Sequence, residues 1–84
     1  MNTTSRPSIA DQAAARVVRE VRLAAGLSQE ALAEAAGLHR TYISLLERAR
    51  RSPSLSTLDA IGRALCFEPS KIYRLIADAV EHAE

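Results

Sequence analysis

The segment LSQEALAEAAGLHRTYISLLERARRSPS, residues Leu27 to Ser54, decides the fold of this 84-residue chain. It is typical of two short helices joined by a turn at Gly37, with arginines directly after the second helix. A unit of this kind can place its second helix in the major groove of DNA while the basic loop contacts flanking phosphates. The segment therefore predicts a protein that binds DNA.

Apolar residues recur every three to four positions outside this segment too, which predicts an all-α fold of five helices. We expect a polar arm over residues 1–8, one domain over residues 9–80 and a tail over residues 81–84. The helix-turn-helix then occupies the second and third helices of a compact domain. The first helix is expected over Ile9–Ala25, the second after the N-cap Ser28, the third over His39–Arg48, the fourth from Ser56 and the fifth from Pro69.

Composition excludes several other classes of protein. No apolar run approaches the roughly 20 residues of a membrane span, and the N-terminus has no secretory signal, so we expect a cytoplasmic protein without membrane contact. Cys66, His39 and His82 lack the spacing of metal ligands, so neither a metal nor a cofactor is expected. The chain also has no glycine-rich phosphate loop and no arrangement typical of catalysis, so we do not expect an enzyme.

Charge is unevenly distributed along the chain, although the formal net charge is only +1. Residues 1–51 hold eight arginines and five acids, a balance of +3, whereas residues 52–84 hold three basic residues and five acids, a balance of −2. Residues 40–51 contain four arginines and one acid, a density suited to phosphate contacts that release condensed counterions. We expect the basic half to face DNA and the acidic half to face away.

The third helix has an inward face marked by Ile43 and Leu46, with Leu38 packing just before it. Its other face has no apolar stripe to bury. That free face follows the Gly37 turn and precedes the arginines. It is therefore the surface expected to read DNA.

Several motifs together resemble the Cro/CI-type, or XRE-like, helix-turn-helix family of phage repressors and small bacterial regulators, whose fold is that of the lambda repressor DNA-binding domain. The resemblance covers about Val18 to Ile76. The matching features are Arg22, the LSQE opening at Leu27–Glu30, Gly37, Ile43, the pair Leu46 and Glu47, and the P-S-x-x-T-L segment from Pro53. The RTYIS run at Arg40–Ser44 is most similar to the controller proteins of restriction-modification systems.

The resemblance implies which outward residues of the third helix contact bases. Arg40 is the strongest candidate, since its planar fork can donate two hydrogen bonds to O6 and N7 of guanine, although a phosphate-only contact is the alternative. Thr41 can bond a base or touch a thymine methyl, and Ser44 can reach a base or a phosphate; a solvated surface role is open for both. Tyr42 could pack against the second helix or reach DNA, and Leu45 could contact a methyl group or pack at the core margin.

The resemblance also implies the phosphate contacts. Gln29 matches a glutamine that contacts the backbone at the start of the second helix, where the helix dipole favours an anion, although it could be merely exposed. Arg48, Arg50 and Arg51 match residues that contact phosphate beyond the reading helix, with a solvated basic loop as the alternative. His39 stands where the family usually has a serine or threonine cap. Histidine is a poorer cap, so His39 is expected either to approach a phosphate or to be a plain surface residue.

Two charged pairs have other implied roles. The resemblance makes Arg22 and Glu47 a buried or half-buried ion pair between the first and third helices, and neither is expected to read bases. Glu30 and Glu34 lie four residues apart on the second helix and match acidic positions that touch RNA polymerase in some phage repressors. A solvated helix face is the alternative for Glu30 and Glu34.

The fifth helix carries more apolar residues than one narrow buried stripe requires. Some of them are therefore expected to meet a second copy of the chain across a two-fold axis, with a monomer-only core as the alternative. The expected interface residues are Ile72, Tyr73, Leu75, Ile76 and Val80.

Taken together, these features predict a sequence-specific regulator of transcription that binds double-stranded DNA as a homodimer on a palindromic operator. The controller resemblance implies both repression and activation, the latter through RNA polymerase. The rival prediction is a protein-binding module, an antitoxin whose helix-turn-helix regulates its own toxin-antitoxin operon. Such an antitoxin should co-purify with a small toxic partner, yet the chain has few residues to spare for wrapping one.

Overall fold

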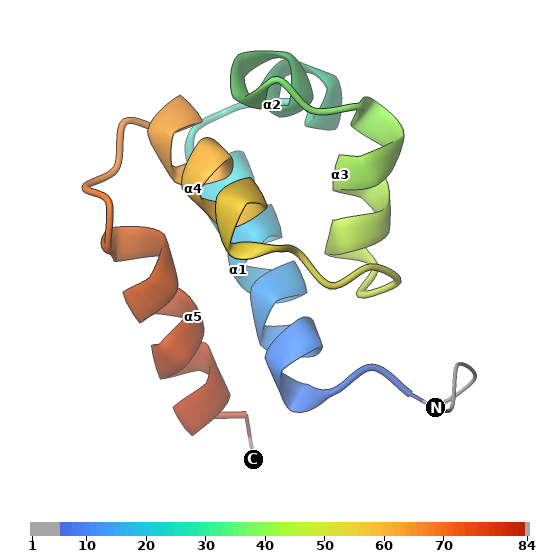
Figure 1. The fold of residues 1–84 in the computed structure, drawn as a ribbon, viewed down its shortest axis with the longest axis vertical. Helices are drawn as coiled ribbons and strands as arrows, with labels where there is room; N and C mark the ends of the chain where they lie inside the picture. The colour runs from blue at the N-terminus through green and yellow to red at the C-terminus, as the bar shows by residue number, and fades with distance from the viewer. Residues whose placement is uncertain (1–5, 84) are drawn as a thin grey trace.

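The computed structural model describes residues 6–83, in which all the regular structure is helical (Figure 1). The helices are α1 (Ile9–Ala24), α2 (Gln29–Ala36), α3 (Arg40–Glu47), α4 (Leu55–Ala64) and α5 (Lys71–Glu81). The predicted all-α fold with five helices is confirmed. Residues 1–5 of the predicted arm and residue 84 of the predicted tail lie outside the described residues, and α5 reaches one residue into that tail. None of the described helices combines the length and apolar character needed to cross a membrane.

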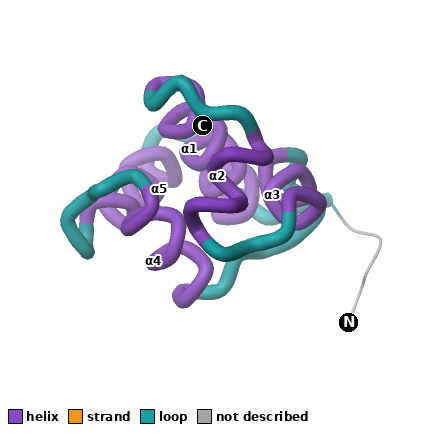
Figure 2. The backbone as a smooth tube through the Cα atoms, turned by 90° about the horizontal axis from the view of Figure 1, so that it is seen from above, coloured by secondary structure: helices purple, strands orange, loops and turns teal. Residues whose placement is uncertain are grey.

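The longest helix, α1, lies between α5 on one side and α3 on the other (Figure 1). The helix α2 packs against α3 and α4, and α4 in turn packs against α5. Figure 2, seen at right angles to Figure 1, places α3 and α5 at opposite edges of the molecule. The helix expected to read DNA and the helix expected to form a dimer are therefore on different sides.

The core draws on every helix. Ile43 and Leu46 are almost completely buried, which confirms the predicted inward face of α3. Burying one such aliphatic side chain stabilises the fold by about 1.5 to 3 kcal/mol, so the core holds α3 against its neighbours. The largest fully buried side chains are Val18 of α1, Leu32 of α2, Ile43 and Leu46 of α3, Ile61 of α4 and Ile72 of α5.

Serine hydroxyls cap the first turns of α1, α2 and α4. The caps are Ser8, Ser28 and Ser54, which accept hydrogen bonds from the backbone N–H groups of Asp11, Ala31 and Thr57. The predicted start of α4 at Ser56 is wrong, because Ser54 lies 3.0 Å from the Thr57 nitrogen and starts the helix two residues earlier. The predicted start of α5 at Pro69 is also early: Pro69 lies in a turn, and α5 begins at Lys71.

The first four helices end in the same way, with one residue in the left-handed conformation. These residues are Gly26, Gly37, Ala49 and Cys66, with φ between 58° and 74°. In each case the following N–H donates to a carbonyl five residues earlier, at 2.8 to 3.1 Å. The following residue is a half-buried Leu27, Leu38 or Phe67 in three turns, but an exposed Arg50 after α3. The turn after α3 therefore presents charge where the others bury an apolar side chain.

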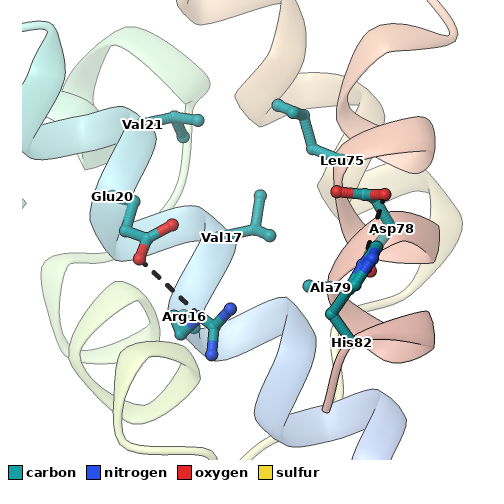
Figure 3. A pocket seen from close by; sticks show the side chains of 8 residues that line it. All are labelled: Arg16, Val17, Glu20, Val21, Leu75, Asp78, Ala79 and His82. Atoms are coloured by element: carbon teal, nitrogen blue, oxygen red, sulfur yellow. Dashed lines mark hydrogen bonds and ion pairs between the residues drawn. The ribbon is translucent and has the colours of Figure 1, made fainter.

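A pocket lies between α1 and α5 (Figure 3). Its floor includes Val17, Val21 and Leu75. Its rim carries two pairs, Arg16 with Glu20 on α1 at 3.7 Å and Asp78 with His82 on α5 at 3.5 Å. Each rim pair is formed within one helix, so neither pair joins α1 to α5 across the pocket.

Glycine at position 49 should stabilise the protein. Ala49 has φ 58°, a conformation that a Cβ atom disfavours and glycine adopts freely. We expect Ala49→Gly to raise the free energy of unfolding by about 0.5 to 1 kcal/mol in urea denaturation. The control, Ala35→Gly within α2, should lower it by a similar amount, because that residue is helical. A loss of stability in Ala49→Gly would contradict this account of the turn.

Candidate nucleic-acid interface

The free face of α3 carries four of the residues predicted to contact bases. A helix turns about 100° per residue, which sets Thr41, Ser44 and Leu45 on the side away from the buried Ile43. Arg40 and Thr41 are exposed, whereas Ser44 and Leu45 are half-buried. The structure therefore brings Arg40, Thr41, Ser44 and Leu45 onto one accessible surface.

Tyr42 lies at the margin of this surface and is half-buried. Its hydroxyl lies 3.3 Å from Oγ1 of Thr57 in α4, and the guanidinium of Arg51 stands 5.2 Å from the centre of its ring. Sequence reasoning considered α2 or DNA as partners and missed both α4 and Arg51. The Tyr42 hydroxyl therefore has a partner in α4, and it can accept from Thr57 while still donating to another group.

His39 caps α3 instead of forming its first turn. The predicted helix start is one residue early, since α3 begins at Arg40 and Nδ1 of His39 accepts a hydrogen bond from the Thr41 N–H at 3.2 Å. An accepting Nδ1 leaves the proton of a neutral imidazole on Nε2. His39 therefore does cap α3, although histidine is a poor capping residue. The Nε2–H of its exposed ring is still free to donate a hydrogen bond.

The basic residues after α3 are exposed and held in a defined loop. Arg48 is the C-cap rather than the last helical residue, and its Nε donates to the Ser44 carbonyl at 3.3 Å. The Ser52 hydroxyl donates to the Asp11 carboxylate of α1, which ties the loop to the first turn of α1. Within residues 6–83, Arg40, Arg48, Arg50 and Arg51 form no ion pair with an acidic side chain. Their charge is therefore available to an anion.

The predicted ion pair between Arg22 and Glu47 is present and nearly buried. Nε of Arg22 lies 2.6 Å from Oε2 of Glu47 and Nη2 lies 2.9 Å from Oε1, with side-chain exposures of 11% and 4%. Nη1 of Arg22 donates to the Leu27 carbonyl at 2.8 Å. Hydrogen bonding to Glu47 and its negative charge raise the pKa of Arg22 further above its already high value. Folded and unfolded chains thus both carry this charge at neutral pH, so titration of Arg22 does not alter stability there.

Gln29 takes part in the same cluster. Its Nε2 donates to Oε1 of Glu47 at 3.0 Å, and its side chain is half-buried. The phosphate contact predicted for Gln29 stays a prediction; within the protein, its amide contacts Glu47 of α3. Nothing in the spacing of Gln29 and Glu47 signals this bond, because they are 18 residues apart.

Residues 18–66, more than half of the chain, match the family model described as helix-turn-helix. The chain belongs to this helix-turn-helix family. The matched range contains α2, α3, α4 and the Arg22–Glu47 pair, so the family match and the interface geometry concern the same part of the molecule.

The chain is similar to two control proteins and to one restriction-modification controller protein of known structure. The control protein C.SmaI of Serratia marcescens is 54% identical over 48 residues, 57% of this chain and 57% of that protein. The control protein C.BamHI of Bacillus amyloliquefaciens is 45% identical over 56 residues, 66% of this chain and 69% of that protein. The controller protein C.Esp1396I, solved as a tetramer with its natural 35 base-pair operator, has a TM-score of 0.79 at 29% identity and covers 87% of this chain and 96% of that one. The chain thus spans little more than half of C.SmaI.

In this helix-turn-helix protein, the apolar residues of α5 are divided among three positions around the helix. Ile72 is 1% exposed and belongs to the core, so its predicted place in a dimer interface is corrected. Leu75 faces the pocket against α1 (Figure 3). At 100° per residue, Tyr73, Ile76 and Val80 share the opposite flank. Those three, and the half-buried Leu75 on the other flank, remain candidates for contact with a second copy.

The flank of α5 that carries Tyr73 continues onto the start of α4. The Tyr73 hydroxyl donates to the Leu55 carbonyl at 3.1 Å, and the Leu55 side chain is 73% exposed. Leu55, Tyr73, Ile76 and Val80 form what we call the α4–α5 patch. Sequence reasoning missed Leu55, because it placed this residue in the loop before α4.

The acidic residues Glu30 and Glu34 are both exposed on α2. Among residues 6–83 neither forms an ion pair, so both charges face solvent. In the same described range, no group of three His, Cys, Asp or Glu side chains could hold a metal ion. The available chemistry of this surface is hydrogen bonding and charge.

Removal of the buried carboxylate should destabilise the fold strongly. We expect Glu47→Ala to lower the free energy of unfolding by about 3 to 5 kcal/mol in urea denaturation, because it leaves Arg22 buried without a counter-ion. Glu34→Ala, the control at an exposed glutamate, should change it by less than about 0.5 kcal/mol. Arg22→Met combined with Glu47→Met should recover much of the loss. If Glu47→Ala and Glu34→Ala changed the free energy of unfolding equally, the Arg22–Glu47 pair would not be what holds the helices together.

Proposed function

We propose that this protein is a sequence-specific regulator of transcription of the restriction-modification controller type, not an enzyme. It acts in the cytoplasm as a homodimer on a palindromic operator in double-stranded DNA. The observation that carries the proposal is the accessible face of α3, which includes Arg40 and is followed by three more arginines; none of the four has an acidic partner within residues 6–83. The similarity to C.SmaI, C.BamHI and the operator complex of C.Esp1396I supports it.

Sequence is read in this proposal by the free face of α3 lying in the major groove. Arg40, at the first turn, donates two hydrogen bonds to guanine. Thr41 and Ser44 supply hydroxyls to bases or nearby phosphates, and Leu45 contacts a thymine methyl. Tyr42 contributes at the edge of this surface. Specificity therefore rests on few side chains, with Arg40 the most important.

Affinity comes from the phosphate contacts on either side of that face. Arg48, Arg50 and Arg51 neutralise phosphates and release counterions, and the exposed Nε2–H of His39 donates to a phosphate oxygen. The tie between Ser52 and Asp11 supports this role, because it holds the loop beside α3 before DNA binds.

A homodimer gives the two reading helices their spacing. The α4–α5 patch is apolar and most of it belongs to α5, at the edge of the molecule opposite α3 (Figure 2), so a two-fold contact through it leaves both reading faces free. One turn of DNA, about 34 Å, then separates the helices, and half-sites lie about ten base pairs apart. The similarity to control proteins favours this function over an antitoxin, whose discriminating sign would be co-purification with a toxin.

Two arginine substitutions should have different effects on DNA binding. Arg40→Ala should weaken specific binding by about 1 to 3 kcal/mol and relax the preference at one base pair. Arg50→Ala should weaken binding to all sequences alike and reduce the slope of log affinity against log salt by about 0.9. Titrations on a selected operator and on random DNA measure both. Equal losses on the two DNAs for Arg40→Ala would refute its role in base reading.

The dimer contact can be tested without disturbing the core. Leu55 is exposed in the monomer, so Leu55→Glu should fold normally yet place two carboxylates at a two-fold contact. In sedimentation equilibrium we expect wild type to be dimeric and Leu55→Glu largely monomeric at roughly tens of micromolar protein. The control is Leu23→Glu, at an apolar residue of α1 that is 54% exposed, and it should remain dimeric. A dimer in both variants would place the interface elsewhere.

Glu30 and Glu34 give the protein a surface for RNA polymerase in addition to its repressing contact with DNA. Charge reversal by Glu30→Lys with Glu34→Lys should abolish activation of a reporter gene while repression of the protein's own promoter persists. Glu20→Lys, at an exposed glutamate of α1, is the control. Loss of repression together with activation would rule out a separate activating surface.

A further inference from the structure

The carboxylate of Glu47 receives donors from two other helices. Arg22 of α1 donates to both of its oxygens, at 2.6 and 2.9 Å, and Nε2 of Gln29 in α2 donates to Oε1 at 3.0 Å. Glu47 is the last residue of α3, and its side chain is 4% exposed. The end of α3 is therefore held from α1 and α2 at a single carboxylate.

The bond from Gln29 has a particular place in the helix-turn-helix. Gln29 is the first residue of α2 and Glu47 the last residue of α3, while the turn at Gly37 joins the other ends of these helices. The bond thus joins the two ends that the chain leaves free. With the covalent turn at one end and this bond at the other, the angle between α2 and α3 is constrained twice.

We propose that Gln29 is a positioning residue that sets the angle of α3, and thereby sequence specificity, by orienting Glu47. This inference rests on the proposed function. Phosphate contacts tolerate a small change of angle because long, exposed arginine side chains can follow the DNA backbone. Hydrogen bonds to base edges tolerate it poorly because their directions are fixed. Loss of the Gln29 bond should consequently weaken specific binding and spare nonspecific binding.

The test compares Gln29→Met, which keeps the length of the side chain but removes its donors, with wild type on a selected operator and on random DNA. We expect about tenfold weaker operator binding, as for the loss of one hydrogen bond to a charged group, with binding to random DNA unchanged. Gln29→Asn, too short to reach Glu47, should behave in the same way. Gln12→Met, at an exposed glutamine of α1, is the matched control and should bind like wild type. Circular dichroism at the assay temperature verifies that each variant is folded.

Equal losses on operator and random DNA would overturn the inference and assign Gln29 a direct phosphate contact. An unchanged operator affinity would overturn it as well. Failure of the proposed function itself looks different, because wild type would then show no preference for any selected DNA sequence. The ratio of the two affinities, rather than stability, is the deciding measurement.

Discussion

The ion pair between Arg22 and Glu47 fixes the end of α3 against α1 in this small domain. Its two side chains are almost removed from water, so each depends on the other for compensation of its charge. Arg22 also bonds the Leu27 carbonyl in the turn before α2. One arginine thus connects the end of α1, the turn before α2 and the end of α3. Ile43 and Leu46 pack the inward face of α3 into the core.

Around this fixed helix, the two kinds of DNA contact have different supports. The free face of α3 belongs to a helix anchored by buried side chains and a buried charge. The arginines that follow belong to a loop held by the Ser52–Asp11 hydrogen bond and by the stacking of Arg51 on Tyr42. In the proposed function, directional base reading therefore falls to a helix anchored in the core, and charge neutralisation to an exposed loop.

Periodicity was enough to predict the helices and the inward face of α3, since Ile43 and Leu46 can share a buried side only in a helix. It could not choose between Ser54 and Ser56 as the cap of α4, because both are serines with a hydroxyl that can accept a backbone hydrogen bond. Periodicity also could not tell which apolar residues of α5 belong to the core and which are free to contact a second copy. Ile72 lies in the core because α1 and α4 enclose it, a fact of tertiary packing that no local pattern contains. The bonds of Gln29 to Glu47 and of Ser52 to Asp11 join residues 18 and 41 positions apart, beyond the reach of such patterns.

The exposed Arg50 has a consequence for where the native structure opens. At the other three helix ends, Leu27, Leu38 or Phe67 must leave the core margin before the turn can unwind, which adds a hydrophobic cost to local unfolding. At the end of α3 no such side chain is withdrawn from the core, and the left-handed Ala49 adds a strain that opening relieves. Local unfolding of the basic loop consequently requires less free energy than unwinding the other three turns. Phosphates that bind the loop would close it and protect its amide hydrogens from exchange with solvent.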